Sequence, residues 1–106
     1  MDTATIVTQI GDAINSGRQI ESFSKRGFKL SFDTAYKIAS RARASFDTSP
    51  LVGRKIGFTN RGIWSKYGVD QPIWGDISNA SVSHHEDEQA TIELSSLCEP
   101  RIEPEV

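Results

Sequence analysis

The sequence predicts an α+β fold, with helices in its first half and strands in its second. Two segments before residue 50 carry apolar residues at helical spacing, whereas the segments after Pro50 are short runs separated by glycine, proline and polar turns. Because the helices and the strands are segregated along the chain, they are typical of α+β rather than of alternating α/β proteins. We therefore expect a helical region at residues 1–50 and the start of a β-rich domain at residues 51–106.

Residues 2–16 are predicted to form the first helix. Its apolar residues recur every three or four positions, and they are Ile6, Val7, Ile10, Ala13 and Ile14. Asp2 or Thr3 can cap its start, and Gly17 stands where a left-handed C-terminal cap belongs. Residues 18–32 read as a connection, because they mix glycine, serine and charged residues without a period.

A second helix is predicted from about Asp33 to Phe46. Ser31 or Asp33 offers the cap, and alanines at positions 35, 39 and 42 form an apolar stripe. Close packing against another helix explains such small residues.

The strands are expected after Pro50. In the first, residues 51–59, Arg54, Ile56 and Phe58 should face one way and Lys55 the other, because side chains alternate along a strand. Asn60 should cap a short helix that ends at Gly68. The remaining extended segments are predicted at residues 72–77, 90–94 and 100–106.

Composition excludes several classes of function. Residues 1–81 carry 11 Lys/Arg and 7 Asp/Glu, whereas residues 82–106 carry 1 and 7. This acidic end, without a clustered basic face upstream, argues against nucleic-acid binding. No apolar run approaches the ~18 residues of a membrane span. The single cysteine, Cys98, excludes an internal disulfide and, with no signal peptide, favours the cytoplasm. The adjacent His84 and His85 lie in an acidic, polar stretch and are expected to be a solvated turn.

Glu103 and Glu105 are candidate metal ligands. In an extended strand residues two apart point to the same side, so both carboxylates would face one region. Two neighbouring carboxylates repel each other unless a proton or a cation lies between them, and Mg²⁺ prefers oxygen ligands of this kind. On spacing alone, two solvated acids on an exposed strand are the favoured explanation of the pair. A complete site would need a third protein ligand beyond Val106.

Four motifs occur in an order that resembles a known family. They are Gly53-Arg54-Lys55-Ile56-Gly57-Phe58-Thr59, Tyr67-Gly68-Val69-Asp70-Gln71-Pro72, Trp74-Gly75 and Pro100-Arg101-Ile102-Glu103-Pro104-Glu105. The succession is similar to the N-terminal part of 2-keto-4-pentenoate hydratases, which belong with the 4-oxalocrotonate decarboxylases to the fumarylacetoacetate hydrolase superfamily. The resemblance implies a mixed β-roll, here apparently truncated.

The resemblance also implies a chemistry. Glu103 and Glu105 would be the first two of three acidic ligands to Mg²⁺ or Mn²⁺, and Lys55 would transfer protons or hold the substrate carboxylate. The substrate would be a small 2-hydroxydienoate or 2-oxo acid of aromatic-compound catabolism, and the protein a homo-oligomer. Arg101 would either steer that carboxylate or pair with a neighbouring glutamate. Where family hydratases commonly carry an aspartate after the proline, this chain has Ile73, which leaves hydration, decarboxylation and C–C hydrolysis open.

A second reading is a non-catalytic relative that serves as an interaction or assembly module, or an inactive fragment. A strand ending at Val106 would leave an open sheet edge, and such edges recruit other chains. We therefore expect the 106-residue chain alone to self-associate or fold poorly, and to show no turnover.

Overall fold

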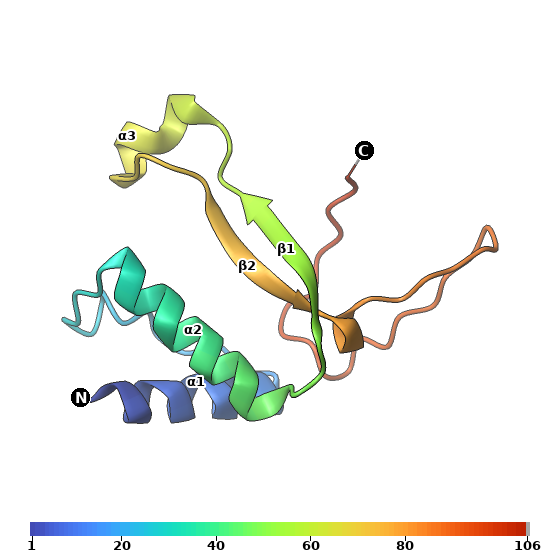
Figure 1. Ribbon diagram of the computed structural model, residues 1–106, viewed down its shortest axis with the longest axis horizontal. Coiled ribbons are helices and arrows are strands. Elements are labelled where there is room, and N and C mark those ends of the chain that lie inside the picture. The colour runs from blue at the N-terminus through green and yellow to red at the C-terminus, as the bar shows by residue number, and fades with distance from the viewer. Residues whose placement is uncertain (106) are drawn as a thin grey trace. The chain divides into compact units, whose positions relative to one another are not determined.

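The computed structural model describes residues 1–105 and has an α+β composition over that range. Its elements are α1 (Thr3–Ser16), α2 (Phe32–Phe46), β1 (Leu51–Gly57), the 3-10 turn η1 (Arg61–Ile63), α3 (Trp64–Tyr67), β2 (Ile73–Ser78) and the 3-10 turn η2 (Asn79–Ser81) (Figure 1). They fall into two compact units. The helical unit comprises residues 1–48 together with residues from 85 onward, and the strand unit comprises residues 49–84.

Both ends of α1 are capped as predicted. The Thr5 backbone N–H donates to the Asp2 carboxylate over 2.8 Å, and Gly17 ends the helix in the left-handed conformation, with φ of 62°. Gly17 is needed here for two reasons. A side chain is strained at this φ, and an added Cβ would lie 3.3 Å from the backbone oxygen of Ser96.

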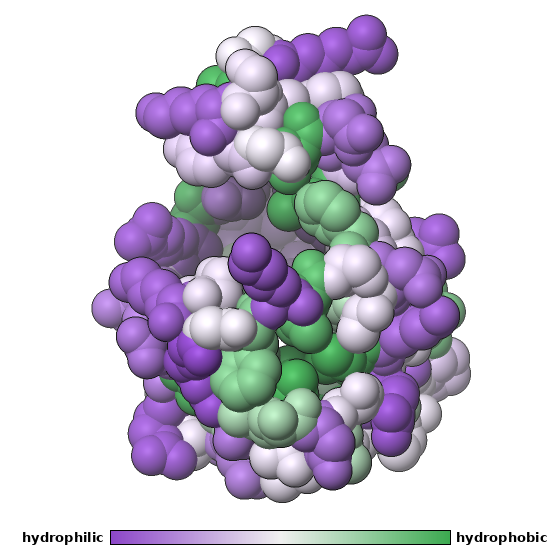
Figure 2. Space-filling view, turned by 90° about the vertical axis from the view of Figure 1, so that its left-hand side faces the viewer, coloured by the Kyte–Doolittle hydropathy of each residue, from purple (hydrophilic) through white to green (hydrophobic). Residues whose placement is uncertain are grey.

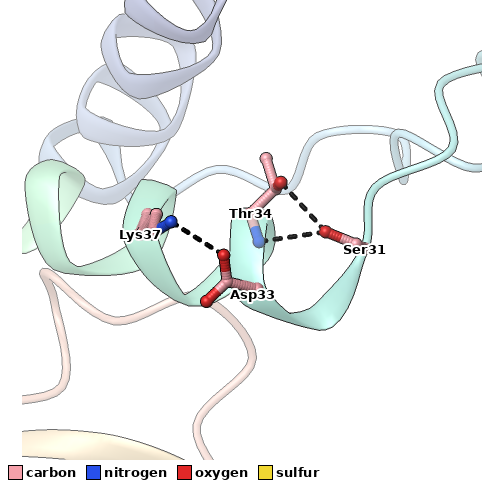
Figure 3. A network of polar contacts seen from close by, with 4 residues as sticks. All are labelled: Ser31, Asp33, Thr34 and Lys37. Atoms are coloured by element: carbon pink, nitrogen blue, oxygen red, sulfur yellow. Dashed lines mark hydrogen bonds and ion pairs between the residues drawn. The ribbon is translucent and has the colours of Figure 1, made fainter.

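The start of α2 is fixed by a small polar network (Figure 3). Ser31 is the capping residue: its hydroxyl oxygen accepts from the Thr34 backbone N–H over 3.2 Å, and the two hydroxyl groups are 2.9 Å apart. One turn on, the Lys37 ammonium lies 2.7 Å from the Asp33 carboxylate. Of the two capping residues that the sequence offered, Ser31 is the one used.

A small core joins the two long helices. Ile6 of α1 and Ile38 and Ala42 of α2 are buried, and Gly11 allows close approach, since a Cβ there would lie 3.4 Å from the Ser45 hydroxyl oxygen. The alanine stripe therefore serves packing in part, as predicted. Much apolar surface nevertheless stays exposed in this unit, and Figure 2 shows apolar side chains gathered among hydrophilic ones.

In the strand unit, β1 and β2 form a two-stranded antiparallel sheet (Figure 1). Arg54 lies opposite Asp76, Lys55 opposite Gly75 and Ile56 opposite Trp74, and the register shifts between Leu51 and Gly53. Directly opposed residues share a face of an antiparallel sheet. Arg54 and Ile56 therefore share a face with Trp74, and Lys55 points to the other face, as the alternation predicted.

Two predicted strands are not formed. Residues 90–94 and residues 100–105 have no regular secondary structure, and the rest of the last predicted strand, Val106, lies outside the described residues. The physical reason is that a strand needs a partner for its backbone N–H and C=O groups, whatever its side-chain pattern. Neither segment has a ladder partner among residues 1–105. The turn in which the Leu97 N–H donates to the Leu94 oxygen ends the first segment.

Candidate functional site

Lys55 lies on a face of the sheet that also carries three glycines and two isoleucines. Its neighbours two residues away on β1 are Gly53 and Gly57, and its partner on β2 is Gly75. A Cβ added at any of these three glycines would meet nothing within 4 Å. Ile77 and Ile73 lie opposite Gly53 and Gly57, so they share this face. The glycines therefore leave space between these two apolar side chains, beside Lys55.

The opposite face holds a stacked cation that the sequence analysis did not identify. The guanidinium carbon of Arg54 lies 4.3 Å from the centre of the Trp74 ring, and its Nε is 3.9 Å from the Asp76 carboxylate. The Asp76 side chain is 16% exposed and that of Arg54 is 64% exposed. Stacking and the ion pair together orient a guanidinium that remains accessible to solvent. The cross-strand register would have revealed this group, but a single strand read alone does not.

The turn after β1 is held in an unusual backbone conformation. Phe58 has a positive φ of 60°, which costs a bulky residue energy. Two contacts stabilise it: the Trp64 indole N–H donates to the Phe58 carbonyl oxygen over 2.8 Å, and the Tyr67 ring meets the Phe58 ring edge-on at 5.3 Å. The predicted short helix does begin near Asn60, whose side-chain oxygen accepts from the Gly62 N–H, and it ends at Gly68. These contacts tie the end of the Lys55 strand to the helix that follows.

The predicted acidic ligands lie in an exposed, irregular segment. Residues 101–105 are all exposed, so Glu103, Glu105 and Arg101 are accessible to solvent, and no ladder imposes the alternation on which their pairing was predicted. Across residues 1–105 no three His, Cys, Asp or Glu side chains gather closely enough to hold a metal ion. Lys55 belongs to the strand unit and the two glutamates to the helical unit.

The other candidate groups are exposed as well. His84, His85 and Cys98 are at the surface, and the histidines lie in an irregular stretch, as predicted. Within residues 1–105 no helix has both the length and the apolar composition to cross a membrane. The Ser95 backbone N–H, which donates to the Glu93 carboxylate over 3.0 Å, holds the pKa of that group below its ordinary value.

Comparison with curated proteins adds what geometry alone does not supply. The chain is 29% identical over 108 residues to a 2-hydroxypent-2,4-dienoate hydratase of Pseudomonas putida, an alignment that covers 96% of the chain and 48% of the relative. It is 34% identical over 97 residues to a 2-keto-4-pentenoate hydratase of Paraburkholderia xenovorans, covering 89% and 35%. With a 2-keto-4-pentenoate hydratase of Burkholderia vietnamiensis the identity is 39% over 56 residues, covering 53% and 20%.

In sequence, the chain is hydratase-like. The similarity to 2-keto-4-pentenoate hydratases, expected from the four motifs, is confirmed, and it extends over nearly all of the chain. The chain spans about half the length of the first of these relatives and less of the others. No protein-family model matches it, and neither does any solved structure.

Proposed function

We propose that this chain is part of a divalent-metal-dependent lyase of the 2-keto-4-pentenoate hydratase type, acting on small 2-hydroxydienoate or 2-oxo acids in aromatic-compound catabolism. The observation that carries the proposal is the similarity to two named hydratases over 96% and 89% of the chain. The glycines beside Lys55 support it, because they leave space next to the lysine that the family resemblance singles out. The full enzyme would have a mixed β-roll, assemble as a homo-oligomer and work in the cytoplasm, where the Cys98 thiol stays reduced.

Glu103 and Glu105 fit part of a magnesium or manganese site. Their carboxylates are the oxygen ligands that these cations prefer, but two protein ligands do not make a full set. The third acid that the family resemblance implies would lie beyond Val106. A bound divalent ion would supply Lewis-acid stabilisation of an enolate next to the substrate carboxylate.

The chain's own residues would bind the substrate and move protons. The Lys55 ammonium would attract the substrate carboxylate or exchange a proton with the carbon chain of the substrate. Arg101 would assist by attracting the carboxylate. Ile73, where related hydratases commonly have an acid, removes one group that could orient water, so decarboxylation of a 2-oxo acid remains a second candidate reaction within the same site.

The metal proposal can be tested on the 106-residue chain itself. Mn²⁺ added to isotope-labelled protein should broaden the NMR signals of residues 101–105 at millimolar concentration, and Glu103→Gln should abolish that effect. The acidic run Glu86-Asp87-Glu88 is an internal control, because it carries three acids without the proposed role. Equal broadening at both segments would show non-specific attraction and would remove the support for a metal site.

The lysine can be tested separately. Titration of a 2-oxo acid such as 2-oxopentanoate should shift the Lys55 side-chain NMR signal, whereas the signal of Lys66, in the same unit, should stay unchanged. A longer protein that contains this sequence and hydrates 2-hydroxypenta-2,4-dienoate should lose turnover on Lys55→Met. Retention of full turnover in that variant would refute the role of Lys55.

A further inference from the structure

The sheet has an outer edge that can accept another strand. Among residues 1–105 each strand pairs only with the other, so the far side of β1 has no ladder partner. Two strands alone are marginally stable, and an unpaired edge presents a row of backbone N–H and C=O groups. Leu51, Val52 and Ile56 of β1 are 48%, 55% and 59% exposed. The edge is therefore apolar as well as open.

A strand-like segment without a ladder lies elsewhere in the chain. Residues 90–94 alternate, with Ile92 and Leu94 apolar and Thr91 and Glu93 polar. Ile92 is 69% exposed and Leu94 54% exposed. We propose that residues 90–94 of a second copy of this chain add to the free edge of β1 as a third strand.

Charge selects this segment over other strands. β1 carries Arg54 and Lys55 and no acid, whereas residues 86–94 carry four acids and no base. Pairing of β1 with another β1 would bring like charges together. Lysines on sheet edges are known to prevent edge-to-edge pairing in this way. The edge of β2 carries Asp76, which would repel the acidic segment. The β1 edge and residues 90–94 are complementary in charge and in apolar content.

The side chains also fit in one register. With Glu93 on the Arg54 face, the exposed guanidinium, already oriented by Trp74, meets a carboxylate. Ile92 and Leu94 then extend the opposite face, which is apolar as well because it carries Ile73 and Ile77 of β2. The local bond from the Ser95 N–H to Glu93 is exchanged for this contact.

A second copy of the chain supplies both the free edge and the segment that pairs with it. Each chain presents one β1 edge and one 90–94 segment, and residues 1–105 contain no ladder that joins the two. Two copies can therefore exchange segments reciprocally about a two-fold axis, which closes the assembly as a dimer. This contact does not depend on the proposed enzymatic function.

A charge-swap experiment tests the interface. Analytical ultracentrifugation of the wild-type chain over a concentration series should show a monomer–dimer equilibrium. Arg54→Glu and Glu93→Lys should each weaken dimerisation roughly tenfold or more, because each places like charges opposite each other. Mixing the two variants should restore association, since both contacts in the mixed dimer then join opposite charges. Glu86→Lys, the same change outside the segment, should dimerise like the wild type.

The proposal would be overturned by a wild-type chain that stays monomeric at every concentration, by a Glu93→Lys variant that dimerises like the wild type, or by a mixture that fails to associate. Ile92→Asp provides a second disruption that keeps Arg54 and Glu93, and it should also give a monomer. Circular dichroism equal to the wild type will show that each variant is folded, which matters most for Arg54→Glu because that change also removes the ion pair with Asp76. Protection of residues 90–94 from hydrogen exchange in a monomer would indicate pairing within one chain and would equally refute the second copy as occupant.

Discussion

Replacing Gly17 by alanine should destabilise the helical unit through two separable effects. The left-handed φ of 62° costs an L-residue roughly 1–2 kcal/mol. Alanine also restricts the unfolded chain more than glycine does, which stabilises the folded state by about 0.4–1 kcal/mol and offsets part of that cost. The new Cβ would also lie 3.3 Å from the Ser96 backbone oxygen, so the segment that follows Ser95 must shift. Crowding of this kind adds about 1 kcal/mol. We expect a total loss of about 2 kcal/mol.

Gly68 provides the matched control. It ends α3 with nearly the same φ, 66°, but a Cβ there meets nothing within 4 Å. Gly68→Ala should therefore show the backbone cost alone, and asparagine, which tolerates this conformation, should reduce that cost at both sites. Urea unfolding followed by far-ultraviolet circular dichroism reports the helical unit, and the fluorescence of Trp64 and Trp74 reports the strand unit. Equal losses for alanine at both glycines would refute the contact with Ser96.

The remaining predictions concern caps and charges in the helical unit. Ser31→Ala should cost about 1 kcal/mol in urea unfolding, because α2 loses its capping hydroxyl, whereas Ser31→Asp should retain most of the stability. The Thr5 backbone N–H lowers the pKa of Asp2 from its ordinary value of 3.8. The contribution of this capping bond to the stability of the fold is therefore complete above pH 3.8 and is lost as the pH falls through the pKa of the folded state. An acid titration followed by circular dichroism should show this loss, and Asp2→Asn should remove the pH dependence. In urea unfolding, Arg26→Lys should destabilise the helical unit almost as much as Arg26→Ala, because the guanidinium both donates to Gln9 over 2.9 Å and lies over two phenylalanine rings. Full stability of the lysine variant would contradict this.

Local signals in the sequence were sufficient for the helices. The bounds of α1 and α2, the Asp2 and Ser31 caps and the left-handed Gly17 all follow from residues within a few positions of one another. The reason is that helical hydrogen bonds and caps join neighbours in the chain. The same holds for the turn at Gly68. The family resemblance also needed only the order of four short motifs.

Tertiary structure decided the strands. Residues 51–57 and residues 90–94 both alternate, but only the first find a partner, in β2, and become a strand. The stacking of Arg54 on Trp74 and the left-handed Phe58 likewise depend on residues across the sheet or in α3. For the candidate site, the sequence selected Lys55, Glu103 and Glu105 by residue type and motif. Whether two such acids face one another depends on a ladder, because the hydrogen bonds that fix a strand's side-chain alternation come from another segment of chain.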